Sequence, residues 1–145
     1  MGLRYVIRPN MSLVQILWQG KITLPEWIVH LQSFLKDPGQ VSVRKQISDL
    51  RFATLEGSFG EPGFSSVLAL LEQHRDLFAG RMVAVVTSNE FDRARMFEQV
   101  SKSLGANIIV FNDLEPACLW LGVDRKLVDT AFRLLKTGAE DKSGK

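Results

Sequence analysis

Cysteine, histidine and long apolar runs are all scarce in this sequence. The only cysteine is Cys118, so no internal disulfide can form, as is usual for proteins of a reducing cytoplasm. The histidines, His30 and His74, fall on different predicted helices with no metal ligand four residues after either, whereas a zinc site needs three or four nitrogen or sulfur ligands. No run approaches the ~20 apolar residues of a membrane-spanning helix. We therefore expect no metal, no cofactor and no membrane span.

An excess of charge of one sign is also absent. Lys and Arg number 18 and Asp and Glu 16, which gives a formal net charge of +2. The basic residues are scattered, whereas nucleic-acid-binding domains usually carry a clustered basic patch, so no nucleic-acid partner is expected. Residues 1–10 contain Arg4 and Arg8 and no continuous apolar stretch, so no signal peptide is expected. These features predict a cytoplasmic protein.

Apolar residues make up 46% of the 145 residues, and their spacing changes between period two and the helical period. A chain of this length typically forms one domain, which we place at residues 1–138, with residues 139–145 as a flexible charged tail. Strand patterns are predicted over residues 3–8, 12–19, 46–51, 82–86 and 108–111. Helix patterns are predicted over residues 24–35, 64–78, 91–104, 115–121 and 124–136.

The order of these patterns predicts the architecture. Two strands come first with no helix between them, so they can pair as an antiparallel hairpin. Helix and strand patterns then alternate, and parallel strands need such crossovers. We therefore predict an α/β fold with a mostly parallel sheet of about five strands, the first strand antiparallel, with packed helices and a C-terminal helix.

The starts of three helices carry recognisable capping signals. Thr23 and Glu26 have the spacing of a capping box at the first helix. Ser88 or Asn89 is expected to cap the third helix. Asp124 is expected to cap the last helix.

Several strand and strand–helix segments share their order and spacing with a known family. They are residues 18–23 (WQGKIT), 47–51 (ISDLR), 84–88 (AVVTS) leading into 94–97 (ARMF), and 110–121 (VFNDLEPACLWL). Together they resemble STAS domains, the sulfate-transporter and anti-sigma-factor-antagonist family, and more closely the bacterial SpoIIAA-like proteins. The resemblance implies strands laid side by side in a βα superhelix, and a non-enzymatic binding or regulatory module. Some proteins of this fold hold lipids or other small ligands.

The sequence departs from that family at its phosphorylation site. Anti-sigma-factor antagonists carry a phosphorylatable serine just after the third strand, in an Asp-Ser-Ser-Gly-like context at a helix N-terminus. Here the third strand ends at residues 49–51 (DLR), and no such tetrapeptide follows. Ser58, further along the loop, is the first candidate for phosphorylation. The alternative is that Ser58 is a solvated turn residue.

A ligand site is expected at the carboxyl end of the sheet. Open α/β sheets bind ligands beyond the carboxyl ends of their strands, where helix N-termini suit anions. Loops after the third and fourth strands could meet there and hold a phosphate, sulfate or carboxylate. The candidate ligand-binding residues are Arg51, Ser58, Gly60, Thr87, Ser88 and Arg93. The alternative is that these residues only form turns and helix caps.

Other notable residues have simpler expected roles. Asp49 ends a strand without the carboxylate cluster of a Mg²⁺-dependent phosphoacceptor, so we expect it to hydrogen-bond a neighbouring loop. Cys118 is expected to be a small buried hydrophobe, and His74 a packed residue on the apolar stripe of its helix. Phe59 and Phe91 could line an apolar pocket or a dimer patch. The last helix is expected to cover the sheet rather than a second subunit.

The residues and the resemblance together predict a non-enzymatic regulatory or protein-interaction module, acting on a protein partner or as a homodimer. The alternative is a small-molecule binding protein, with an anionic or lipid ligand at the carboxyl ends of the third and fourth strands. A small enzyme is the least favoured class, because the sequence shows no paired acid–base groups.

Overall fold

The chain folds around one sheet whose strand order follows the chain order. The computed structural model describes residues 2–57, 59–74, 80–87, 89–102 and 107–138, so the predicted tail, 139–145, lies outside the described residues. Strand β1 pairs antiparallel with β2, and all later pairs are parallel. The strands are β1 (Leu3–Arg8), β2 (Leu13–Ile22), β3 (Lys45–Leu55), β4 (Arg81–Val85) and β5 (Asn107–Phe111). The predicted fold class is confirmed.

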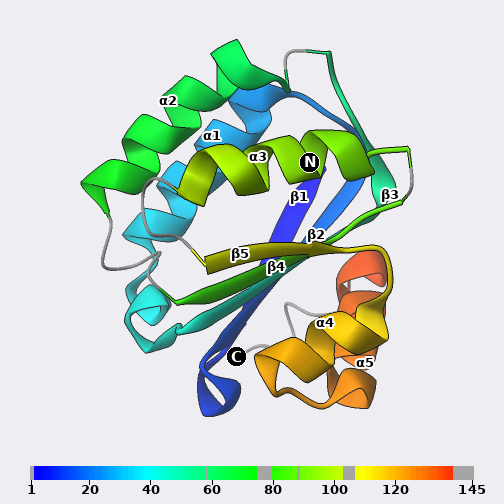
Figure 1. Cartoon of the computed structure of the whole chain (residues 1–145). Helices are drawn as coiled ribbons and strands as arrows, with labels where there is room; N and C mark the ends of the chain where they lie inside the picture. Colours follow the sequence, from blue (N-terminus) through cyan, green and yellow to red (C-terminus); the bar gives the residue numbers. More distant parts are fainter. Residues whose placement is uncertain (1, 58, 75–79, 88, 103–106, 139–145) are drawn as a thin grey trace.

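Helices cover both faces of the sheet, which gives three layers (Figure 1). One face is covered by α1 (Leu24–Lys36), α2 (Glu61–Gln73) and α3 (Phe91–Ser101). The other is covered by α4 (Leu114–Leu121) and α5 (Arg125–Thr137). Every helix among the described residues is too short or too polar to cross a membrane.

Capping groups fix where most of these helices begin. The Thr23 hydroxyl accepts a hydrogen bond from the Glu26 amide at 3.2 Å, and the Glu26 carboxylate accepts one from the Thr23 amide at 3.0 Å, so the predicted capping box is confirmed. Asp124 accepts from the Lys126 amide at 2.8 Å, as predicted. Helix α3 differs, because its N-cap is Glu90 and not Ser88 or Asn89.

The Glu90 side chain does not cap its own helix. Its carboxylate accepts a hydrogen bond from the Leu55 amide at 3.1 Å, and Glu90 is buried. The acid therefore ties the start of α3 to the end of β3. This long-range partner explains why the local capping rule gave the wrong residue.

Strand β3 is longer than its sequence pattern predicts. Pairing with β2 shifts register between Leu17 and Gln19, which face Asp49 and Phe52 and leave one extra residue in β3. This β-bulge breaks the period-two pattern and makes the residues after it read as a loop. The strand in fact continues to Leu55, so the predicted strand end at residue 51 is wrong.

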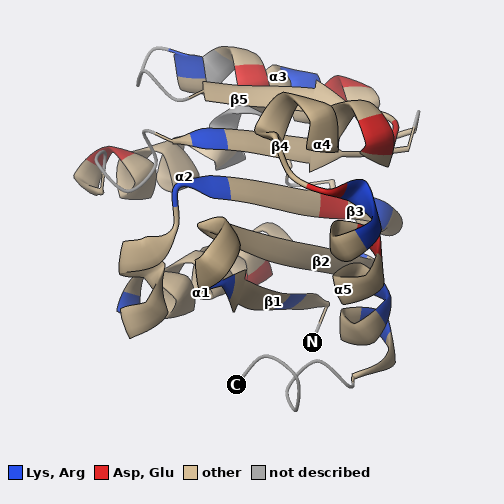
Figure 2. Ribbon diagram, turned by 90° about the horizontal axis from the view of Figure 1, so that it is seen from below, with Lys and Arg blue, Asp and Glu red and all other residues tan. Residues whose placement is uncertain are grey.

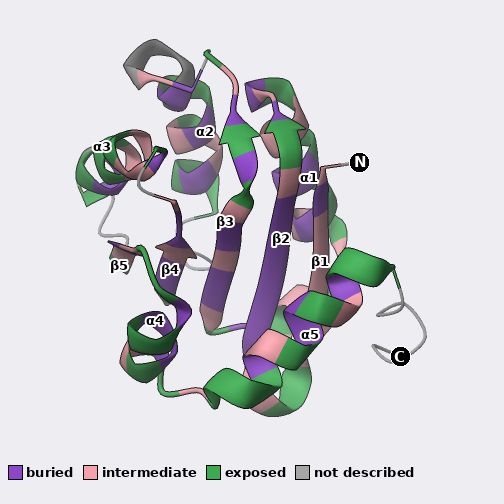
Figure 3. Ribbon diagram, turned by 90° about the vertical axis from the view of Figure 1, so that its right-hand side faces the viewer, coloured by how far each residue is buried: buried purple, intermediate pink, exposed green. Residues whose placement is uncertain are grey.

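The α4–α5 face has a closely packed core. Leu13 and Leu17 of β2 meet Val128, Phe132 and Leu135 of α5, and all five side chains are buried. Figure 3 shows the buried stripe of α5 turned towards the sheet. The last helix therefore covers its own sheet, as expected.

Two further predictions for single residues have opposite outcomes. Cys118 is buried in the α4–α5 core, as predicted, and burial raises the pKa of its thiol to about 11. His74 is exposed at the C-cap of α2, so its predicted packing is wrong. Helix α2 ends at Gln73, so the helical spacing that predicted a packed His74 stops one residue before it.

Candidate functional site: an apolar pocket under α1–α3

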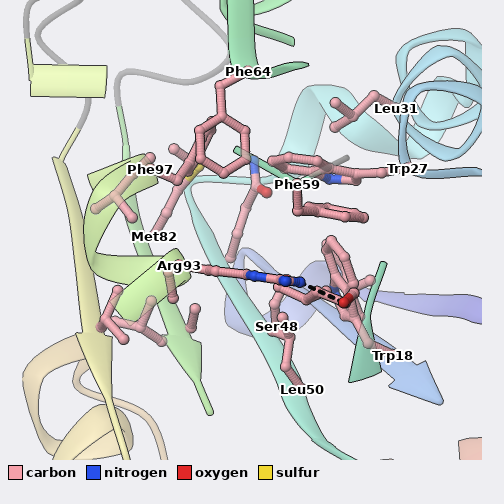
Figure 4. A pocket seen from close by; sticks show the side chains of 18 of the residues that line it. Trp18, Trp27, Leu31, Ser48, Leu50, Phe59, Phe64, Met82, Arg93 and Phe97 are labelled. Carbon is pink, nitrogen blue, oxygen red and sulfur yellow. Dashed lines mark hydrogen bonds between the residues drawn. The ribbon is translucent and has the colours of Figure 1, made fainter. Parts of the chain in front are cut away.

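The α1–α3 face contains a half-open pocket of about 110 Å³, which we call the α1–α3 pocket (Figure 4). Its floor is the sheet, and its roof comes from three helices and the loop after β3. The lining residues are Ile16, Trp18, Trp27, His30, Leu31, Gln46, Ser48, Leu50, Leu55, Phe59, Phe64, Leu71, Met82, Val83, Ala84, Arg93, Ala94, Phe97, Ile108 and Val110.

Small side chains in the middle of the floor open the space. Ser48 of β3 is the direct neighbour of Ala84 of β4, and Ile16 and Val110 flank this pair on β2 and β5. Both small residues are only half-buried, although their strands have neighbours on each side. The two short side chains thus leave a depression where larger residues would fill the interior.

Aromatic rings form most of the roof (Figure 4). Trp27 stacks on Phe59 with ring centroids 5.7 Å apart, and its ring centroid is 5.0 Å from that of Phe97. Phe64 meets Phe97 edge to face at 5.1 Å, and Trp18 lies 5.4 Å from Trp27. Such offset and edge-to-face contacts hold the rings against one another and leave an apolar surface facing the pocket.

Two polar side chains on β3 lie on the floor without a partner. Gln46 and Ser48 are two residues apart, so both face α1–α3. Gln46 is only 9% exposed, and its carboxamide makes no hydrogen bond to the part of the chain that the structure describes. Ser48 makes none either. The amide atoms of Gln46 are not among the fully buried unpaired atoms of the described residues, so the amide keeps contact with the half-open pocket and a ligand there can reach it.

Two ring nitrogens near the pocket are also unbonded within the described residues. They are Nε2 of His30 and Nε1 of Trp18, both buried. Burial lowers the pKa of His30 to about 4, so its imidazole is neutral near pH 7. Tyr5 packs edge-on against it, with ring centroids 5.5 Å apart.

Arg93 is the only charged residue in the described lining, and it lies near the carboxyl end of β3. Its guanidinium donates to the Leu55 and Glu56 carbonyl oxygens, the latter at 3.1 Å, as Figure 4 shows in part. The Glu90 carboxylate lies 3.9 Å from it. The loops after β3 and β4 therefore do meet, and Arg93 and Glu90 join them.

The structure does not bring all the predicted ligand residues together. Arg51 lies on the α4–α5 side of β3, where it binds the buried Asp49 through two contacts of 2.9 Å. Gly60 is the N-cap of α2, and Thr87 is half-buried after β4, where its carbonyl accepts from the Glu90 amide. Ser58, including its predicted phosphorylation, and Ser88 lie outside the described residues.

The Asp49–Arg51 pair is a structural ion pair within one strand. The hydrogen bond to Asp49 raises the pKa of Arg51, and the carboxylates of Asp129 and Asp113 act in the same direction. Figure 2 shows acidic and basic segments adjoining on β3 beside α5. Asp49 thus hydrogen-bonds Arg51 and not a neighbouring loop as expected, because residues two apart along a strand lie on the same face and their side chains can meet.

Sequence reasoning found part of this pocket. Phe59 lines it, as one prediction allowed, whereas Phe91 packs against the surrounding core without lining it. Gln46 and His30 were missed. A signal was available for Gln46: polar residues 46 and 48 share one face of a strand that helices were expected to cover.

Comparisons with known proteins add no family to this picture. The sequence matches no protein-family model, and no curated protein is significantly similar to it. Among the described residues, no group of histidine, cysteine, aspartate and glutamate side chains could hold a metal ion. The pocket, with its apolar walls and few polar groups, is the feature from which a function can be argued.

Proposed function

We propose that this protein is a non-enzymatic binding module that takes a small, largely apolar ligand in the α1–α3 pocket. The observation that carries the proposal is a half-open cavity of about 110 Å³ with aromatic walls. Ligand sites are typically concave and apolar with a few polar groups, and this pocket has that composition. An engineered cavity of about 150 Å³ in another protein takes up benzene, so this cavity suits a single ring or a short chain.

Binding without turnover is favoured by how the polar groups of the lining are used. A nucleophile needs a base within hydrogen-bond reach. Ser48 and His30 both line the pocket, yet no hydrogen bond joins them. Arg93 is already engaged by two carbonyl oxygens. These residues are suited to recognising a ligand rather than transforming it.

The test fills the pocket from its floor. Ala84→Leu adds three carbon atoms beside Ser48 on the pocket floor, and Ala94→Leu is the second choice if Ala84→Leu does not fold. Toluene should shift the indole N–H resonances of Trp18 and Trp27 in the natural protein and leave that of Trp120, on α4, unchanged. The filled variant should lose these shifts. Failure of toluene to move either pocket tryptophan would end the proposal.

A regulatory or protein-interaction role is the second candidate. The observation in its favour is the sheet order, in which every strand lies beside its sequence neighbour, as the STAS resemblance implies. In that role, a protein partner would bind the ligand-bound and ligand-free forms with different affinities. Intact-mass measurement of the protein from its native host tests the phosphorylation version; an unmodified mass under all growth conditions would argue against it.

A further inference from the structure

We propose that the pocket ligand is uncharged and carries one hydroxyl or amide group, which is recognised by Gln46 with the help of Ser48. This inference rests on the proposed binding function and goes further by naming the chemistry of the ligand. Its starting point is the unbonded Gln46 carboxamide on the pocket floor.

Gln46 has no structural task within the described residues. Gln46 is 9% exposed and belongs to the pocket lining. Its paired residue on β4 is Met82, whose side chain forms no strong hydrogen bond. Because the amide atoms of Gln46 are not fully buried, the carboxamide can offer its N–H donors and its carbonyl acceptor to a molecule in the pocket. A ligand that supplies the missing partner accounts for a glutamine at this position.

The residue types define what that partner must be. A carboxamide both donates and accepts hydrogen bonds, and so does the Ser48 hydroxyl two residues along the same face. A ligand group that also donates and accepts, such as a hydroxyl or an amide, can satisfy both. The space around them suits one ring or a chain of similar size.

The charges around the pocket argue against an ionised ligand. A buried carboxylate or phosphate needs a cation beside it. His30 is neutral near pH 7, and Arg93 lies near the far end of β3, held by the Leu55 and Glu56 carbonyls and close to Glu90. Within the described lining, no free cation therefore stands near Gln46.

The experiment compares three probes of one shape: benzamide, toluene and benzoate. Affinities are measured by titration, following the indole N–H resonances of Trp18 and Trp27, with Trp120 as the internal reference. In the natural protein, benzamide and toluene should bind and benzoate should not. Gln46→Met should lower the ratio of benzamide affinity to toluene affinity about tenfold, the usual cost of one lost buried hydrogen bond.

Two further variants keep the test decisive. Gln15→Met makes the same exchange on the neighbouring strand but faces α4–α5, so it should leave the affinity ratio unchanged. Ser48→Ala should lower the ratio by a smaller factor and serves if Gln46→Met does not fold. An unchanged ratio in the Gln46 and Ser48 variants would overturn the polar recognition while leaving the binding function intact.

The remaining outcomes separate the two proposals. If benzoate binds more tightly than benzamide, the ligand is an anion and the inference of a neutral ligand fails. If no probe moves the Trp18 or Trp27 resonance, the proposed binding function fails, and this inference fails with it.

Discussion

The two faces of the sheet treat a buried glutamine in opposite ways. Gln15 of β2 faces α4–α5, where its Nε2 donates to the Val128 carbonyl at 3.0 Å and its Oε1 accepts from Arg8 at 3.1 Å. Gln46 of neighbouring β3 faces α1–α3 and has no partner within the described residues. On the α4–α5 face the protein's own groups satisfy the glutamine, whereas on the α1–α3 face the glutamine lines a pocket and its amide has no partner within the described residues.

The largest expected effect contrasts packing on the two faces. Leu135→Ala should lower the free energy of unfolding by about 4 kcal/mol, because Leu135 is fully buried in the α4–α5 core. Leu31→Ala should cost only about 2 kcal/mol, because Leu31 borders a space that already lacks packing atoms. Urea denaturation measures both. Equal losses would mean that the two faces are packed alike.

The next largest effect is a pH dependence of stability that arises on the α1–α3 face. The folded pKa of His30, about 4, lies below the unfolded value near 6.5, so the unfolded chain binds the proton more readily. Stability should therefore fall as the pH drops from about 6.5 towards 4, by roughly 2 to 3 kcal/mol at about pH 4.5. His30→Leu should remove this part of the pH dependence. If the free energy of unfolding changed with pH equally in the natural protein and in the variant, His30 would not be buried and neutral.

The smallest expected effect compares the two glutamines directly. Gln15→Met should lower the free energy of unfolding by about 1 to 2 kcal/mol, because it removes the hydrogen bonds that Gln15 makes with the Val128 carbonyl and with Arg8. Gln46→Met should cause no comparable loss, because the Gln46 amide makes no hydrogen bond within the described residues. Thermal and urea denaturation of the two variants give the comparison. A large loss for Gln46→Met would show that its amide is needed by the fold itself.

Much of the fold follows from local patterns in the sequence. The hairpin, the alternation of helix and strand, the Thr23–Glu26 capping box and the covering role of the last helix all depend on spacing within short windows. Predictions failed where a distant residue decides the outcome. Glu90 is held by the Leu55 amide, and the pairing of β3 with β2 continues through the bulge.

The pocket was harder to predict because it depends on registers between strands. Ser48 and Ala84 are far apart in sequence, and only the pairing of β3 with β4 places them side by side. The same holds for the roof, where rings from α1, α2, α3 and the loop after β3 converge. The predicted arginines show the limit clearly: Arg51 and Arg93 have the right chemistry, but they lie on different faces.

The bulge in β3 also makes the fold tolerant of a change in chain length at one point. Past the extra residue, Ala53 and Leu55 belong to the α1–α3 core, while Phe52 lies against Lys136 of α5, with its ring centroid 3.8 Å from the lysine nitrogen. Arg51 and Phe52 are consecutive residues on the same side, so losing one of them would restore the regular alternation of the strand and leave Ala53 and Leu55 on the α1–α3 side. The strand can therefore shorten by one residue at this point and still present Leu55 to the cavity.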